Sequence, residues 1–132
     1  MNKRLKKIER ILDVQKKLHQ VAEWKLARID EERAGLKSDE RALVEALNDH
    51  DSLQGLFIDA MARRLAALAR ETERVNRARD QQTRALFAEA LRLGRTERMT
   101  ERLRRQNSEE LWKDSFKEVL ELVGRRRDAS LP

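Results

Sequence analysis

No proline interrupts this chain of 132 residues before its last position, Pro132. Proline breaks helices most strongly, because it lacks an N–H and its ring clashes with the preceding turn. The visible interruption is the segment 48–55, Asn-Asp-His-Asp-Ser-Leu-Gln-Gly, which is rich in turn-forming residues. On either side of it the strong helix formers Ala, Leu, Glu, Lys, Arg and Gln predominate. The sequence therefore predicts two long helices joined by one bend.

The first predicted helix, residues 3–48, carries a heptad pattern whose inward positions are largely apolar. Eight of the thirteen inward residues are Leu or Ile, as a helix packed against a second helix requires. The thirteen are Leu5, Ile8, Leu12, Gln15, His19, Ala22, Leu26, Ile29, Arg33, Leu36, Glu40, Leu43 and Leu47. A second stripe widens the apolar face beyond what a two-stranded seam needs, and it leaves room for a further packing partner. Its members are Ile11, Val14, Leu18 and Val21.

The pattern resumes in the second predicted helix, residues 56–124. Its inward positions are Ile58, Met61, Leu65, Leu68, Thr72, Val75, Arg79, Gln82, Leu86, Glu89, Leu93, Thr96, Thr100 and Leu103. Antiparallel pairing about the bend places Leu5 near Met99, and the polar stretch 79–82 opposite residues 18–24. We expect a seam that is tight at the bend and looser towards the termini. The polar inward positions either set the register of the helices or lie on a turn that faces water.

These patterns predict an all-α fold in which two long helices form an antiparallel coiled-coil hairpin. We expect one elongated unit over residues 1–132, with a bend at 49–55, a longer second helix and a frayed tail at 125–132. Disorder is the alternative, because 41% of the residues are charged and only 4% are aromatic. The helix-forming composition and the four scattered glycines favour the hairpin.

The second helix outlasts its partner after about residue 103, and a new apolar set follows. It comprises Leu111, Trp112, Phe116, Val119, Leu120 and Val123, which are out of phase with Met99 and Leu103. Two outcomes are open. The helix kinks near residues 106–108, with Ser108 as an N-cap, and folds back onto the second stripe of the first helix, or it continues straight and offers a bare stripe to another protein. Gly124 followed by three arginines is typical of a helix end.

Nothing in the chain predicts catalysis, a metal or a cofactor. There is no cysteine, and the chain contains no glycine-rich phosphate loop and none of the common hydrolase or metalloprotease motifs. The histidines, His19 and His50, lie far apart in the sequence, and His19 is expected to pair with Glu23 one helical turn later. We therefore expect a protein that is not an enzyme and that takes no small molecule.

Basic residues gather where the two termini of the hairpin meet. Residues 1–20 contain seven Lys or Arg against two acidic residues, and residues 92–105 contain six Arg against two Glu. Because antiparallel pairing places these two segments side by side, the sequence predicts a strongly basic end of the hairpin. The like charges there repel each other, and an acidic partner would reduce that repulsion. The alternative is a merely solvated face. Nucleic-acid binding is a further alternative, since the pI is about 10.1, although acidic residues on the same turns oppose the approach of phosphates.

No apolar run approaches the roughly 20 residues that a membrane span needs, and the basic start is not followed by a signal-peptide core. The sequence therefore favours a cytoplasmic protein that reaches a membrane only through its partners.

The layout resembles the FliJ family of flagellar type III export components and its virulence-system relatives of the YscO type. The features that carry the resemblance are the basic start 3–8 (Lys-Arg-Leu-Lys-Lys-Ile), a charged coiled-coil hairpin of this length, and the run 98–106 (Arg-Met-Thr-Glu-Arg-Leu-Arg-Arg-Gln). Members of this family look like the central stalk of rotary ATPases. The resemblance implies that the end bearing the termini enters a hexameric export ATPase and that the bend reaches towards the membrane export gate.

By this resemblance, the ATPase-binding candidates are Lys6, Lys7, Arg10, Arg95, Arg98 and Arg102. The candidates for export-gate binding are His50, Leu53, Leu56 and Phe57; Phe57 has the alternative role of covering the turn. Other export chaperones or substrates are further possible partners. The chain departs from the family in its short bend and in its rich apolar segment 111–123. A structural or adaptor coiled coil that dimerises, or that holds a partner through this segment, is therefore the alternative function.

Overall fold

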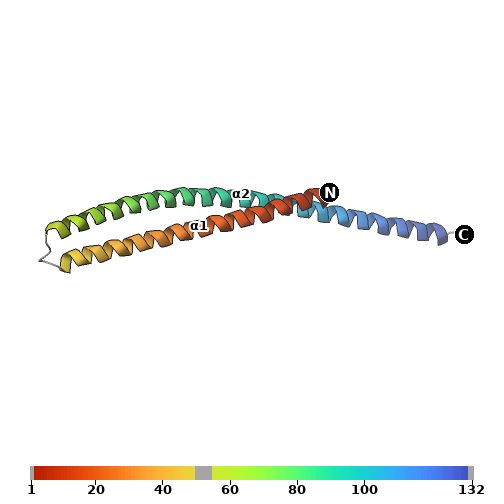
Figure 1. Cartoon of the computed structure of the whole chain (residues 1–132). Helices are drawn as coiled ribbons and strands as arrows, with labels where there is room; N and C mark the ends of the chain where they lie inside the picture. The colour runs from red at the N-terminus through yellow and green to blue at the C-terminus, as the bar shows by residue number, and fades with distance from the viewer. Residues whose placement is uncertain (1, 50–54, 131–132) are drawn as a thin grey trace. The chain divides into compact units, whose positions relative to one another are not determined.

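The structure, a computed structural model, describes residues 2–49 and 55–130, and all of them are helical (Figure 1). Helix α1 spans Asn2–Asp49 and helix α2 spans Gly55–Ser130. The prediction of an all-α hairpin with a longer second helix is confirmed. The chain divides into two compact units: a hairpin unit, Leu18–Ala90, and a terminal unit, which combines Met1–Lys17 with Leu91–Pro132.

In the hairpin unit the two helices lie side by side, with an apolar seam between them (Figure 1). Ala22, Leu68 and Val75 are its buried residues, and Val75 keeps only 1% of its surface exposed. Burial of such side chains supplies most of the stability of a paired helix, because a helix alone in water is marginal. The seam is therefore what holds these long helices in place.

Polar side chains in the same unit bind across the seam. The Gln82 side-chain amide donates a hydrogen bond of 3.1 Å to the carbonyl of Ala22, and Arg79 Nε lies 2.7 Å from Asp30 Oδ1. The Gln82 contact agrees with the expected pairing of 79–82 with residues 18–24, whereas Arg79 reaches Asp30, which lies outside that range. Both contacts favour the interpretation that polar inward positions set the register, since a shift along the helix would break them.

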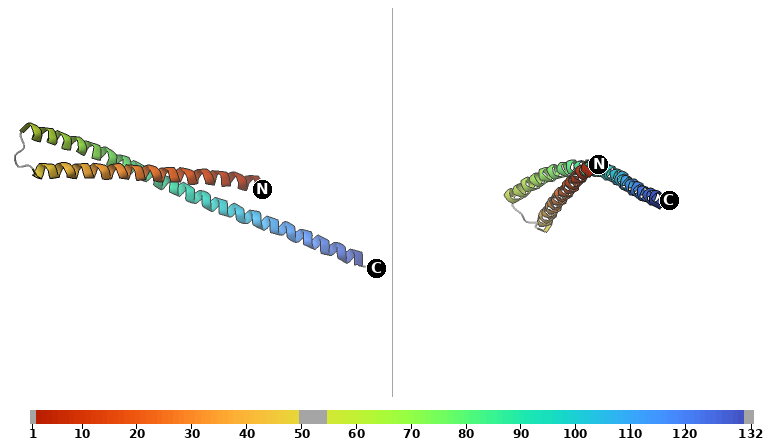
Figure 2. Two further views of the ribbon diagram at one scale, coloured as in Figure 1. Left: turned by 60° about the horizontal axis from the view of Figure 1, so that its bottom comes forward. Right: turned by 90° about the vertical axis from the view of Figure 1, so that its right-hand side faces the viewer.

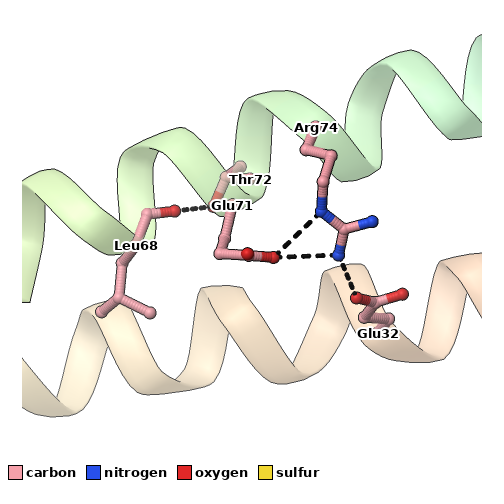
Figure 3. A network of polar contacts seen from close by, with 5 residues as sticks. All are labelled: Glu32, Leu68, Glu71, Thr72 and Arg74. Atoms are coloured by element: carbon pink, nitrogen blue, oxygen red, sulfur yellow. Dashed lines mark hydrogen bonds and ion pairs between the residues drawn. The ribbon is translucent and has the colours of Figure 1, made fainter.

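A third cross-helix contact joins Arg74 to a carboxylate on each helix (Figure 3). Its guanidinium lies 2.8 Å from Glu32 of α1 and 2.9 Å from Glu71 of α2. The hydrogen bonds from Arg74 to Glu71 and Glu32 raise the pKa of the guanidinium. Next to this network the Thr72 hydroxyl donates to the carbonyl of Leu68, 2.8 Å away, which satisfies a polar group at an inward position.

The terminal unit has its own seam, in which two threonines replace larger apolar residues. Ile8 and Leu12 of α1 are buried, as are Thr96 and Thr100 of α2. Thr100 is only 1% exposed, and its hydroxyl donates a hydrogen bond of 2.7 Å to the carbonyl of Thr96. This back-bond to the preceding turn allows a polar side chain to be buried without a loss of hydrogen bonding.

The predicted inward positions match the observed burial closely. Twelve of the thirteen positions in α1 and thirteen of the fourteen in α2 are buried or half-buried, and only Glu40 and Ile58 are exposed. Ile58, at 46% exposure, lies near the bend, and none of the described residues in 39–48 or 57–67 is fully buried. The prediction of a seam tightest at the bend is therefore wrong. The predicted apolar residues Leu43, Leu47, Met61 and Leu65 are present there, but each is only half-buried.

Two expected helix boundaries are also wrong. Helix α2 continues through Gly124 to Ser130 instead of ending near residue 124, and Gly55 belongs to α2 rather than to the bend. No cap or break occurs at Ser108, so the kink near residues 106–108 does not form. Strong helix formers surround Ser108 and Gly124 in the sequence. Nothing lies within 4 Å of the position that a Cβ on Gly124 would take. A lone glycine costs only about 1 kcal/mol in a helix, too little to end one.

The register of the terminal unit differs from the expected one. Glu9 Oε1 lies 3.2 Å from Arg104 Nε, whereas a pairing of Leu5 with Met99 would place Glu9 opposite Arg95. Met99 instead shares a groove with Ile8 and Ile11. The prediction for Leu5 and Met99 is thus wrong: the observed contacts are offset along the helices from the pairing that heptad counting from the bend gives.

Neither described helix contains a stretch that is long and apolar enough to cross a membrane.

Candidate functional site

A groove of about 370 Å³ opens between the two helical segments of the terminal unit. Its apolar lining consists of Ile8 and Ile11 from α1 together with Met99 and Leu103 from α2. Ile8 belongs to the seam, but Ile11 and Met99 are 44% and 50% exposed. The groove is therefore an apolar surface that the chain's own seam leaves uncovered.

Basic and amide side chains form the rim of this groove: Arg4 and Lys7 on α1, and Arg102 and Gln106 on α2. The paired segments, residues 1–17 and 91–107, carry thirteen Lys or Arg against four Asp or Glu, a net charge of +9. The whole chain carries only +6. A positive potential of this density attracts an acidic partner and weakens the fold of the isolated unit by self-repulsion.

The same spacing on both helices builds the groove. The α1 residues occupy positions 4, 7, 8 and 11, and the α2 residues occupy positions 99, 102, 103 and 106. Both sets follow the i, i+3, i+4, i+7 pattern, which gathers side chains on one face of a helix. The ion pair between Glu9 and Arg104 joins the two helices beside the groove.

The structure brings some of the predicted ATPase-binding residues together and leaves others apart. Lys7 and Arg102 lie in the groove rim. The other four, Lys6, Arg10, Arg95 and Arg98, are exposed on the same unit but do not line the groove. Two of the six predicted residues thus lie at the groove, and the other four lie on the exposed surface of the same unit.

The overhang, defined here as residues 108–128 of α2, has no covering segment within the described part of the terminal unit. Every residue in this range is exposed, and Figure 2 shows α2 continuing past the first residues of α1. The fold-back onto α1 therefore does not occur, and Ile11 and Val14 remain 44% and 57% exposed. Of the two outcomes expected for this segment, the straight helix is the one observed.

The predicted apolar stripe runs along this overhang. Its members are between 50% and 67% exposed: Leu111, Trp112, Phe116, Val119, Leu120 and Val123. The rings of Trp112 and Phe116 stack on each other one turn apart, with centroids 5.4 Å apart and an interplanar angle of 5°. Residues 108–123 also carry five acidic side chains against two lysines, a net charge of −3. The overhang is an acidic amphipathic helix without a covering neighbour.

The predicted gate-binding residues fall mostly outside the part of the chain that the structure describes. His50 and Leu53 lie outside the described residues, and Leu56 is described only as part of the α2 backbone. Phe57, in the first turn of α2, is 51% exposed.

His19 forms the local pair that the sequence predicts. Its Nδ1 lies 3.0 Å from Glu23 Oε1, one helical turn further along α1. Among the described residues, no three His, Cys, Asp or Glu side chains come together as a metal site would require.

Sequence reasoning missed the groove itself and its rim residues Arg4 and Gln106. The signal was present, because Arg4 precedes Lys7 and Ile8 at helical spacing, as Met99 precedes Arg102 and Leu103. What could not be read was the register that brings these two faces together. Comparisons of the chain with protein-family models, with curated proteins and with solved structures give no match.

Proposed function

We propose that this protein is a non-enzymatic coupling component of a type III protein export apparatus, a coiled-coil stalk whose basic terminal end binds the export ATPase ring. It would act in the cytoplasm, peripheral to the inner-membrane export apparatus. The observation that carries the proposal is the concentration of a +9 charge on the paired segments of the terminal unit, around an open groove. Such a surface suits a negatively charged or carbonyl-rich collar of loops.

A stalk of this kind performs no bond chemistry. Its insertion would favour different nucleotide states in different ring subunits, because it binds those states with different free energies. The cross-helix contacts of the hairpin unit, such as Arg79 with Asp30, support this role, since coupling requires a helix pair whose register does not slip.

The test is stimulation of the partner ATPase by the charge-reversed chain Arg95→Glu, Arg98→Glu, Arg102→Glu. We expect stimulation to fall at least tenfold, because the rim and its surroundings lose their positive charge. The matched control reverses three exposed arginines of the hairpin unit, Arg64, Arg70 and Arg84, and should stimulate like the unaltered chain.

Undiminished stimulation by the terminal triple variant would contradict the proposal. Equal loss in both triple variants would also contradict it, because the effect would then follow net charge and not the terminal unit. Circular dichroism of each variant establishes that the helices remain intact.

By the same resemblance, the bend end would contact the export gate, with the exposed Phe57 as the testable residue of that end. A Phe57→Asp chain should lose gate binding while retaining stimulation of the ATPase. Loss of both activities would show that the two ends do not act separately.

An adaptor role is the second candidate, because the overhang exposes its apolar stripe along its whole length. In that role the stripe, and not the basic rim, would hold the partner.

A further inference from the structure

We infer that the overhang of one chain docks on the terminal unit of a second copy of the same chain, so that two chains form a reciprocal, two-fold symmetric dimer. The groove that receives the overhang lies on the same basic surface as the proposed ATPase contact, so the two contacts would compete, but the inference does not rest on the coupling role.

Both halves of such a contact are present in one terminal unit. The stripe from Leu111 to Val123 exposes bulky apolar side chains, and the groove around Ile11 and Met99 is an apolar surface that lacks a cover. Monomeric proteins rarely leave large contiguous apolar patches in water, and such patches mark interaction sites. A chain that carries a patch and its complement can bury both by pairing with itself.

The charges of the two surfaces are opposite. The paired segments carry +9 and residues 108–123 carry −3. On a helical wheel, Glu118 falls at one edge of the stripe, beside Leu111, and Glu109 falls between Phe116 and Leu120, near the other edge, which also carries Lys113. The two glutamates would meet the basic rim formed by Arg4, Lys7 and Arg102. Docking would therefore relieve the self-repulsion of the terminal unit as well as cover apolar surface.

The stripe is long enough to cover the groove. It extends over thirteen residues, 111–123, or about 20 Å of helix, whereas the groove lining extends over residues 4–11 of α1 and 99–106 of α2, or about 12 Å. The overhang of each copy can thus lie along the paired segments of the other. The overhang begins two residues after Gln106 of the groove, so stripe and groove are neighbours on each copy, and we infer that both contacts form between the same two chains, which closes the arrangement. Contacts with different chains would instead build an open chain of copies.

Reciprocal docking also brings the contact area into the usual range. Stable interfaces bury about 1,200–2,000 Å² in total, which one helix face alone supplies only in part. Two equivalent helix faces, anchored by the aromatic pair of Trp112 and Phe116, double the buried surface. Aromatic residues are the commonest anchors of such interfaces.

The first test measures the molar mass of the full chain by light scattering in about 0.1 M salt. We expect twice the chain mass of 15.6 kDa at high concentration. The Trp112→Ala, Phe116→Ala chain should dissociate at least tenfold more readily. The matched control, Trp24→Ala with Phe87→Ala, removes aromatic residues of the hairpin unit that are at least 63% exposed and should remain a dimer.

The second test reverses the charges of each surface separately. The groove-reversed chain carries Arg4→Glu, Lys7→Glu and Arg102→Glu. The overhang-reversed chain carries Glu109→Lys, Asp114→Lys and Glu118→Lys. Each should be a monomer alone, whereas their equimolar mixture should form a heterodimer, because each altered surface then meets an oppositely charged one.

A wild-type chain that stays monomeric up to about 1 mM would overturn the inference, and so would a mass that grows beyond two chains as concentration rises. A mixture that remains monomeric would overturn the assignment of the two surfaces. These results are separate from the ATPase test, because they need only the purified chain. If both proposals hold, the aromatic double variant loses the dimer and still stimulates the ATPase.

Discussion

The hairpin unit and the terminal unit contain the same kinds of residue but complete their packing to different extents. In the hairpin unit each helix has a partner, and contacts such as Gln82 to Ala22 cross the seam. In the terminal unit the seam ends, and α2 continues for more than twenty residues with every side chain exposed from residue 108 to residue 128. Helical propensity thus sets where a helix can form, whereas a partner helix decides what it can bury.

The first prediction compares the same Leu→Ala substitution in the two seams and in the overhang. Leu68→Ala in the hairpin unit and Leu12→Ala in the terminal seam each remove a side chain that is only 5% exposed. Each should lower the free energy of unfolding by about 2–3 kcal/mol, because a cavity adds to the lost burial. Leu122→Ala, at 60% exposure in the overhang, should change it by less than about 0.5 kcal/mol.

Denaturant unfolding followed by circular dichroism measures these differences. The values should be taken at a concentration where light scattering gives the monomer mass, so that dimerisation does not contribute. Equal losses at Leu68 and Leu122 would show that the overhang is packed within its own chain.

The second prediction concerns a polar residue at a seam position. Arg33 occupies an inward position of the hairpin unit, and its Nε is buried without a hydrogen-bond partner. Arg33→Leu should raise the free energy of unfolding by about 1–2 kcal/mol, because it removes an unsatisfied polar group and adds apolar burial. Gln15→Leu, which removes a similarly buried Oε1 from the terminal unit, should have the same sign.

A drop in stability for either leucine variant would mean that the polar side chain contributes an interaction stronger than apolar burial. Chemical denaturation of the two single variants and the double variant separates their contributions.

The third prediction tests the helices where packing plays no part. Nothing lies within 4 Å of a Cβ built on Gly35 or on Gly124, and both residues are exposed within α-helices. Gly35→Ala should raise the free energy of unfolding by about 0.5–1 kcal/mol through higher helix propensity. Gly124→Ala should raise the helix content of the overhang with little effect on global unfolding. No gain at Gly35 would indicate that the glycine makes a contact that alanine cannot.

The smallest expected effect is at the ion pair of Arg79 with Asp30. Both side chains are more than a third exposed, so Asp30→Asn should lower the free energy of unfolding by roughly 0.2–0.5 kcal/mol, and less in 0.5 M salt. A large loss that salt does not reduce would mean that the pair holds the register by itself.

The sequence predicted the fold better than it predicted the site. Heptad spacing identified nearly all inward residues, because burial along a helix pair follows the same periodicity as the sequence. It failed for the tightness of the seam near the bend, because heptad spacing gives the direction of a side chain but not how completely it is buried. It failed for the helix end at Gly124, because one glycine costs too little to end a helix. It also missed the groove, because the pairing of Ile8 and Ile11 with Met99 depends on the register of the two helices, which the spacing within each helix does not fix.

Amide hydrogen exchange, followed across a dilution series, tests directly whether the overhang is uncovered in the monomer and becomes covered by a second chain. In the dilute monomer, amides of residues 18–48 and 57–90 should be protected, while those of residues 108–128 should exchange far faster. As the dimer forms, protection should rise in the overhang and in residues 2–17, and it should not change in the hairpin unit. An overhang that is as protected as the hairpin in the monomer would contradict the account, because its stripe would then already be covered by its own chain.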